Sequence, residues 1–215
     1  DNYFSSLSNS LFLGVAVGLG CACFSILINY ISRFSKSKFF SFYKKIINMG
    51  YALPGVVIAL GVLILINKIT LFASHLFSIS LFGLIIALTI RLIALSNNSL
   101  ESGLDKIPRS IDDASRMIGR RSSTTYFRII IPQIKLSILA GFFLVLVDTM
   151  KELPITLLLR PFNFDTLATS LYEYSSDELF ELGALHAFTI IISLSIAIYF
   201  FDSFLEKKII SKEKK

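Results

Sequence analysis

The sequence predicts an all-α membrane protein, a polytopic bundle of five transmembrane helices in a single domain over residues 1–215. Three observations predict this class. Hydrophobic residues make up 54% of the 215 residues, the mean hydropathy is +0.71, and the apolar residues form long runs rather than short stripes. About 20 apolar residues are needed to cross roughly 30 Å of hydrocarbon, and a helix satisfies its own backbone hydrogen bonds there.

Five apolar runs have about this length, and each predicts one crossing. The first is uncharged and carries small residues, including Gly14 and Gly18, which suit close helix packing. The third contains one charge, Arg91, which we expect near the inner end of the helix, where its long side chain can reach the interface. The five predicted crossings are 11–31, 51–66, 76–95, 134–150 and 184–201.

Lysine and arginine cluster after the first run, between the third and fourth runs, and at the carboxyl terminus. Cytoplasmic loops retain positive charge, so five crossings with the first residue outside place all three clusters and the carboxyl terminus in the cytoplasm. Topology then explains the net charge of +6 without a nucleic-acid partner. We expect a multi-pass membrane protein. Because the chain begins at Asp1 without a signal pattern, we expect a fragment, or one half, of a longer protein.

Residues that usually catalyse reactions or bind metals are few. Cys21 and Cys23 would lie on different sides of one helix, which favours packing roles over a disulfide or a metal site. His75 and His186 are isolated near the ends of separate runs, where packing or interface roles are expected. The sequence has no nucleotide-binding glycine loop and no nucleophile motif, so we expect neither enzyme activity nor a bound cofactor.

The segment 98–132 is too polar to cross a membrane, yet it is patterned. Pro108 predicts the start of a helix with two aspartates in its first turn, and Gly119 predicts its end, because glycine adopts left-handed backbone angles without strain. A second short helix is expected over about 122–128. Such a hairpin is either a knob gripped by a partner or an amphipathic hairpin resting on the membrane. One apolar stripe is predicted along the first helix, formed by Ile111, Ala114, Met117 and Ile118.

The same segment resembles the EAA signature of ABC-importer permeases, which reads Glu-Ala-Ala, three residues, Gly, nine residues, Ile-x-Leu-Pro. Here Asp113-Ala114-Ser115, Gly119 and Ile129-Ile130-Ile131-Pro132 follow one another at the same spacing. Three departures, Asp for Glu, Ser for Ala and Ile for Leu, conserve size or charge. The resemblance implies a MetI-like permease core in a bacterial inner (plasma) membrane, in which 98–132 is the cytoplasmic coupling-helix loop that docks on an ATPase. The implied coupling residues are Asp113, Ala114, Ser115, Gly119, Ile129 and Pro132.

A second segment, 150–169, looks like the Lys-Glu-Leu-Pro and Arg-Pro-Phe-Asn-Phe-Asp-Thr-Leu-Ala-Thr stretch of ferric-iron permeases. Related permeases for thiamine, sulfate or polyamines share pieces of it and remain alternatives. The resemblance implies import of ferric iron from an external binding protein, together with a second permease half. It also implies a cytoplasmic ATPase dimer, which would bind the ATP and Mg. An ion-coupled secondary transporter and a non-transporting scaffold stay open as hypotheses of other classes.

Ionisable residues near the outer end of the fourth run predict the translocation pathway or its gate. Asp148, Lys151 and Glu152 would share one face of a continuing helix, and charged groups at membrane depth usually face an aqueous cavity. Alternatively, they mark the outer interface. An acidic stretch at 173–181 suits hard cations, but we expect a solvated or docking surface there. Pro154 breaks the helix beside the pathway. The predicted pathway residues are Asp148, Lys151, Glu152, Pro154, Arg160, Asp165 and Thr169.

Overall fold

The computed structural model describes residues 2–35, 46–70 and 76–213, and these residues form helices and connecting turns without a strand. The predicted all-α architecture is confirmed. The helices are α1 (Asn2–Phe34), η1 (Gly50–Ala52), α3 (Gly55–Thr70), α4 (Leu76–Leu104), α5 (Ser110–Met117), α6 (Ser122–Thr125), η2 (Tyr126–Ile130), α7 (Ile131–Gln133), α8 (Lys135–Met150), α9 (Pro154–Leu159), α10 (Leu167–Ser176) and α11 (Phe180–Glu213).

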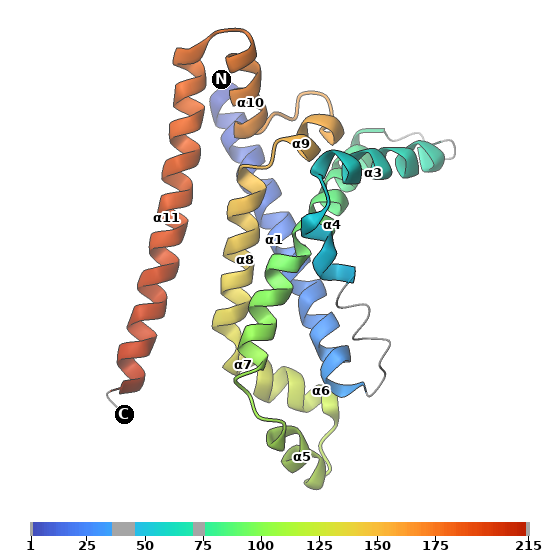
Figure 1. The fold of residues 1–215 in the computed structure, drawn as a ribbon, viewed down its shortest axis with the longest axis vertical. Helices are drawn as coiled ribbons and strands as arrows, with labels where there is room; N and C mark the ends of the chain where they lie inside the picture. Colours follow the sequence, from blue (N-terminus) through green and yellow to red (C-terminus); the bar gives the residue numbers. More distant parts are fainter. Residues whose placement is uncertain (1, 36–45, 71–75, 214–215) are drawn as a thin grey trace.

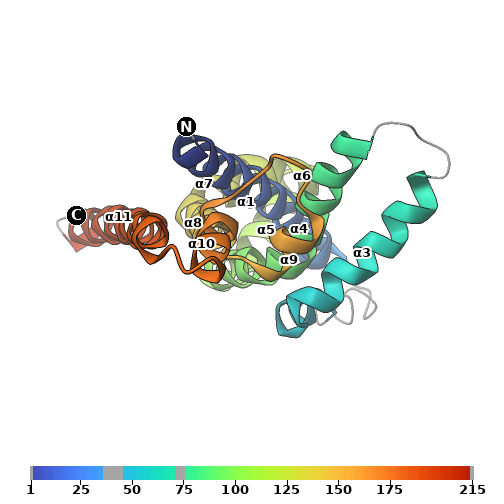
Figure 2. The same cartoon turned by 90° about the horizontal axis from the view of Figure 1, so that it is seen from above.

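Helices α1, α4 and α8 pack side by side and form the centre of the molecule (Figure 1). Seen from above, α11 and α3 lie on opposite sides of this bundle (Figure 2). The core between α1, α4 and α8 is apolar, because each helix buries the stripe that faces the other two. Its buried residues include Leu13, Val17, Leu84, Leu88 and Val145.

Two glycines of α1 allow it to approach α8 closely. A Cβ atom added at Gly18 would lie 2.9 Å from the Phe142 ring, and one added at Gly14 would lie 3.3 Å from Leu146 Cγ. These separations leave little or no room for a larger side chain. The prediction that small residues of the first run serve helix packing is therefore confirmed.

The number of five crossings is not confirmed. Within the described ranges, two helices are long and apolar enough to cross a membrane, and the count rises to four if each of two bent helix pairs is one crossing. The predicted second crossing is one of these bent pairs, because Ile46–Ala52 meets α3 at 113°. Leu53 is extended and precedes Pro54, and a residue before proline is disfavoured in the helical region. As a result, α3 runs across the direction of the central helices (Figure 1).

The third predicted crossing ends too early, because α4 continues to Leu104 rather than ending at Leu95. Its additional turns carry polar residues that bond to neighbouring helices. Asn97 accepts a hydrogen bond from Asn29 Nδ2 at 2.9 Å, and Ser99 Oγ donates one to the Ser137 carbonyl at 2.7 Å. The predicted loop 98–132 therefore begins as helix. The polar residues that predicted a loop in the sequence instead form hydrogen bonds between helices.

The cysteines and one histidine can be compared with their predictions. Cys21 is buried in the core and Cys23 is exposed, and both thiols are free, in agreement with the prediction that they form no disulfide. His186 is buried between the rings of Tyr3 and Tyr174, which confirms a packing role. His75 lies outside the described residues.

The two ends of the molecule differ in what they carry. The carboxyl ends of α1 and α11 lie at the same end as α5 and α6, whereas the amino terminus lies at the opposite end with α9 and α10 (Figure 1). The carboxyl ends of α1 and α11 and the helices α5 and α6, which lie next to or within the predicted basic clusters in the sequence, thus share one end of the bundle. We call this the hairpin end, and the opposite end the outer end.

Candidate functional site

The hairpin consists of α5, the turn at Gly119, and α6 with the π-helical η2. Gly119 has a φ of +73°, so the predicted left-handed end of the first helix is confirmed. The second helix begins at Ser122, as predicted, and continues through η2 to Ile130. Local sequence signals were sufficient here because a proline, a pair of aspartates and a glycine mark the ends of the first helix.

The first helix of the hairpin buries polar residues and exposes apolar ones. Asp112 and Ser115 are buried, whereas Met117 and Ile118 at its tip are 90% and 78% exposed. The predicted apolar stripe therefore does not pack inward as a unit. Polar burial is tolerated because both groups are bonded: Asp112 pairs with Arg33, and the Ser115 hydroxyl lies 2.5 Å from the Thr125 hydroxyl.

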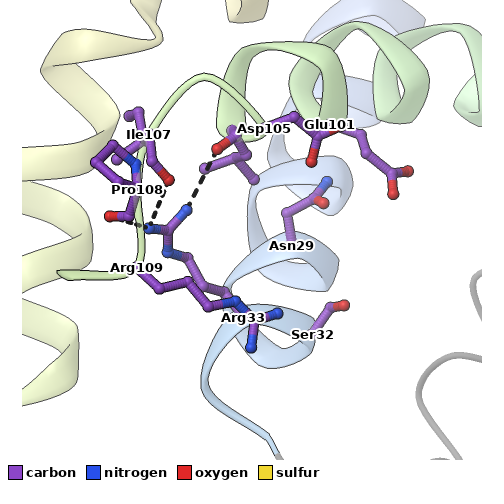
Figure 3. Close-up of a pocket in the computed structure, with 9 residues that line it drawn as sticks. Asn29, Ser32, Arg33, Glu101, Asp105, Ile107, Pro108 and Arg109 are labelled. Atoms are coloured by element: carbon purple, nitrogen blue, oxygen red, sulfur yellow. Dashed lines mark hydrogen bonds between the residues drawn. The ribbon is translucent and has the colours of Figure 1, made fainter. Parts of the chain in front are cut away.

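The hairpin is attached to the end of α1. Arg33 Nε donates to Asp112 Oδ2 at 2.8 Å, and the Tyr126 hydroxyl donates to the Ile26 carbonyl at 3.0 Å. Tyr30 and Phe34 of α1 pack their rings against that of Tyr126. A polar cavity of about 300 Å³ lies beside this junction, between the ends of α1 and α4 and the loop that leads to α5 (Figure 3). Its charged lining residues are Arg33, Glu101, Asp105 and Arg109.

The predicted coupling residues fall into two groups. Five of them are exposed: Asp113, Ala114, Gly119 and Ile129 on the hairpin, and Pro132 in α7, which follows it. Ser115 is buried and its hydroxyl bonds to Thr125, so it holds the two helices of the hairpin together. The residues of the first group are accessible to a partner, and so are Met117 and Ile118 at the apolar tip. Arg33 and Asp112 were not predicted, and the pattern of the loop alone gives no signal for their pairing.

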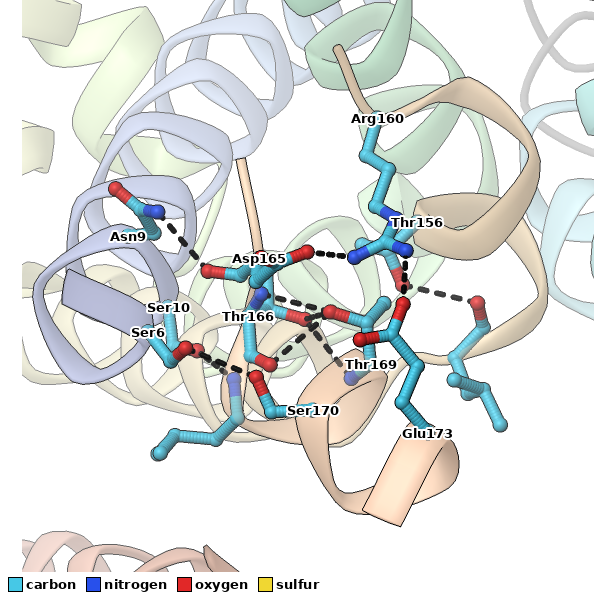
Figure 4. A network of polar contacts seen from close by, with 12 residues as sticks. Ser6, Asn9, Ser10, Thr156, Arg160, Asp165, Thr166, Thr169, Ser170 and Glu173 are labelled. Atoms are coloured by element: carbon cyan, nitrogen blue, oxygen red, sulfur yellow. Dashed lines mark hydrogen bonds and ion pairs between the residues drawn. The ribbon is translucent and has the colours of Figure 1, made fainter. Parts of the chain in front are cut away.

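At the outer end, three predicted pathway residues meet in one polar network. Arg160 binds the carboxylates of both Asp165 and Glu173 (Figure 4). Thr166 and Thr169 form the capping box that begins α10, so the predicted Thr169 is buried in a structural role. These contacts fix the segment between α9 and α10.

The amino-terminal turns of α1 complete this network. Asn9 Nδ2 donates to the Asp165 carbonyl at 2.9 Å, and Ser10 Oγ accepts from the Leu167 amide at 2.8 Å (Figure 4). The Ser6 and Ser170 hydroxyls lie 2.9 Å apart. Ser6, Asn9 and Ser10 were missed because they precede the predicted first crossing. Their helical spacing, three and four residues apart, is a signal that was available in the sequence.

The three charged residues at the end of the fourth run do not continue as one helical face, because α8 ends at Met150. Lys151 Nζ lies 2.7 Å from Asp148 Oδ1 and is 55% exposed, and this hydrogen bond raises the pKa of Lys151. Glu152 instead is buried, with Oε2 3.7 Å from Arg91 Nε. The predicted break at Pro154 is confirmed, since Pro154 is the first residue of α9.

Arg91 therefore does not reach an inner interface, and that prediction is wrong. Its guanidinium lies between Glu152 and Gly55, where an added Cβ atom at Gly55 would collide with Nη1. An acidic group within reach makes pairing more favourable than extension toward water, because a lone charge at membrane depth is expensive. Arg91 Nε and Nη1 and Glu152 Oε1 form no hydrogen bond with other described atoms.

Comparison with known proteins identifies this architecture. The family described as binding-protein-dependent transport system inner membrane component matches residues 14–211. The chain belongs to this family of permeases. The resemblance inferred from the hairpin motif is thereby confirmed, and this permease is the membrane component, not the ATPase, of an ABC transport system.

One curated relative of the permease is the Fe(3+)-transport system permease protein FbpB 2 of Haemophilus influenzae, which is 27% identical over 149 residues. The match covers 69% of this chain and 29% of the relative, so the permease spans less than a third of that protein's length.

Solved structures share the fold of the permease. A bacterial alginate ABC transporter in complex with a periplasmic protein matches with a TM-score of 0.74 and 13% identity, covering 94% of this chain and 77% of the other. An amino acid ABC transporter with histidines matches with a TM-score of 0.63 and 18% identity, covering 96% and 94%. Both have the helical fold of an ABC transporter permease.

Proposed function

We propose that this permease forms part of the translocation pathway of an ABC importer for ferric iron. A cytoplasmic ATPase dimer docks on the hairpin, an external binding protein delivers the cargo at the outer end, and a second permease half completes the pathway. In this arrangement the hairpin end faces the cytoplasm of a bacterial cell and the first residue lies outside. ATP and Mg bind to the ATPase, and this chain holds no cofactor.

The observation that carries the ATP-driven mechanism is the exposed tip of the hairpin on a firmly held base. Met117 and Ile118 are adjacent and form one exposed apolar patch at the tip, and contiguous apolar patches on a surface can mark protein–protein contact sites. Their base is held by Arg33 and by the Ser115 and Thr125 hydroxyls, so a force on the tip displaces the hairpin as a unit. Rigid-body motion of such an element can change which end of the pathway is open.

Support for ferric iron comes from a different part of the chain. The segment 150–169 resembles ferric-iron permeases, and the curated relative carries Fe(3+) in its name. Asp148 with Lys151, and Glu152 with Arg91, place charged groups where the segment leaves α8. We propose that these residues, together with Pro154, line or gate the pathway. Arg160, Asp165 and Thr169 hold the neighbouring segment in position.

A transport assay tests both parts of the proposal. The assembled transporter, with its ATPase and second permease half, is reconstituted in vesicles and supplied with radioactive ferric iron on the external binding protein. We expect uptake that requires ATP. Uptake of thiamine, sulfate or a polyamine instead of iron would contradict the choice of cargo, and uptake driven by an ion gradient without ATP would contradict the mechanism.

The role of the hairpin is tested in the same vesicles with Gly119→Val. Valine is strained at a φ of +73° but meets no atom within 4 Å, so the variant changes the turn rather than the packing. We expect the purified ATPase to bind more weakly and uptake to fall. Lys106→Gln removes a charge from an exposed position before the hairpin and is the matched control. Full uptake in Gly119→Val would count against docking at this turn.

A further inference from the structure

We infer that Arg33 is a positioning residue of transport, through which displacement of the hairpin moves α1. The inference rests on the proposed ATP-driven function and deepens it by naming the link between the docking helix and a membrane helix. Arg33 lies in the last turn of α1 and reaches α5, the first helix of the hairpin.

The link is a buried ion pair with a short hydrogen bond. Arg33 Nε and Asp112 Oδ2 are 2.8 Å apart, and the two side chains are 8% and 7% exposed. Charge-assisted hydrogen bonds of this kind are stronger and more directional than neutral ones. Because neither group is in bulk water, separating them would leave two buried charges unpaired, which strongly disfavours independent movement of α1 and α5.

The same guanidinium also holds the chain that leads into the hairpin. It donates to the carbonyls of Leu104, Ile107 and Pro108 at 3.4, 3.3 and 3.5 Å (Figure 3). The carbonyls at a helix end lack partners within the helix, and Leu104 is the last residue of α4. One side chain therefore connects the end of α1, the end of α4 and the start of α5. A planar group with five donors can do this, whereas a lysine cannot.

A second contact between α1 and the hairpin reaches a different helix. The Tyr126 hydroxyl bonds to the Ile26 carbonyl, but Tyr126 belongs to η2, beyond the exposed tip. Arg33 reaches α5 itself, the helix that carries Asp113 and Ala114. A push on α5 is therefore passed to α1 at Arg33 before it can be passed on through η2.

Movement of α1 would also displace its amino-terminal turns at the outer end. With about 1.5 Å per residue, this helix is about 50 Å long. At its far end, Asn9 bonds to Asp165, which precedes α10, and Ser10 bonds to Leu167, the first residue of α10. Along its length, Gly14 and Gly18 keep it close to α8. A rigid helix held at both ends can carry a displacement from the ATPase to the outer polar network.

The test compares uptake with ATP hydrolysis in the same vesicles of assembled transporter. For Arg33→Gln we expect the ATPase to remain bound and hydrolysis to stay within about twofold, while cargo taken up per ATP falls about tenfold, a typical coupling effect. Asp112→Asn should have a smaller effect, because Arg33 keeps its three carbonyl partners. Lys106→Gln is the charge-matched control and should leave the ratio unchanged.

An unchanged ratio of uptake to hydrolysis in Arg33→Gln would overturn the inference, and so would a parallel loss of uptake, hydrolysis and ATPase binding. If Arg33→Gln does not assemble, Arg33→Lys decides, because it keeps the charge but loses the planar fork. A ratio lowered about threefold or more supports the inference, and an unchanged ratio overturns it.

A second readout does not depend on the cargo. Ser8 is exposed at the outer end of α1, so a Ser8→Cys variant, with Cys21 and Cys23 replaced by alanine, reports movement there through its rate of thiol labelling. We expect ATP to change this rate, and the change to disappear with Arg33→Gln. If ATP changes labelling equally in both, the inference about Arg33 fails. If ATP changes the labelling rate of the Ser8→Cys transporter but the transporter does not import iron, only the proposed cargo is wrong.

Discussion

Replacing Glu152 with glutamine should destabilise the permease, because it leaves Arg91 buried without a counter-charge. At an effective dielectric constant of about 20, charges at the observed separation of 3.7 Å attract by roughly 4 kcal/mol. Breaking a buried pair typically destabilises a protein by about 3–5 kcal/mol. Because Arg91 is 21% exposed and the contact is longer than a hydrogen bond, we expect a loss of about 2–3 kcal/mol.

A double-mutant cycle measures this coupling. The variants are Glu152→Gln, Arg91→Met and the double variant that combines these two substitutions, each followed by thermal unfolding of the assembled transporter in lipid. We expect each single variant to melt at a lower temperature and the double variant to recover most of the loss, since no buried charge is left alone. Lys151→Gln is the matched control, because an exposed pair contributes at most about 1 kcal/mol.

Two outcomes would refute parts of this reasoning. If Glu152→Gln melts no lower than Lys151→Gln, or if the two single effects simply add in the double variant, Arg91 and Glu152 are not a coupled pair. If the double variant recovers iron uptake as well as stability, Glu152 has only a structural role and its place in the pathway is wrong. Recovered stability with uptake still lost is the result that the proposed pathway requires.

Three further variants test the packing, the hairpin tip and the polar contacts. Gly18→Val should destabilise the permease by about 1–3 kcal/mol, because even the added Cβ atom would lie 2.9 Å from the Phe142 ring. The control is Gly61→Ala, whose added Cβ atom would have no atom within 4 Å. Thermal unfolding compares the two variants. Met117→Glu should leave the melting temperature unchanged, because the side chain is 90% exposed, but should weaken binding of the purified ATPase in a pull-down. Asn97→Leu removes one of the two hydrogen bonds that the buried Asn29 amide donates, while the bond to the Ser25 carbonyl remains, and should destabilise by about 1–2 kcal/mol in the same unfolding assay.

Those parts of the fold that depend only on residues close together in the sequence were predictable. The bounds of α8 and the hairpin turn at Gly119 follow from local signals, namely a long apolar run and a glycine in the left-handed region. The orientation of α3 did not follow, although Pro54 was visible in the sequence. A proline indicates that a helix is interrupted, but the angle between the two parts depends on what they pack against.

The candidate site was predictable only where a motif marks it. The EAA-like spacing located the hairpin and its exposed residues, but it did not locate Arg33, which is 79 positions away from Asp112 in the chain. Similarly, nothing local indicates that Asn9 bonds to the backbone of Asp165. Contacts of this kind depend on which helices are neighbours, and local patterns in the sequence do not indicate that.

The two errors concerning α4 and Arg91 have one cause. If the helix ended at Leu95, Arg91 would lie within one turn of the hairpin end, where extension toward water is favourable. Because α4 continues to Leu104, Arg91 lies about 20 Å from that end, at 1.5 Å per residue. Glu152 follows α8, which starts at the same end, and lies about 25 Å away by the same measure. At similar depths on adjacent helices, a buried cation and a buried anion stabilise each other, so the length of α4 determines which partner Arg91 has.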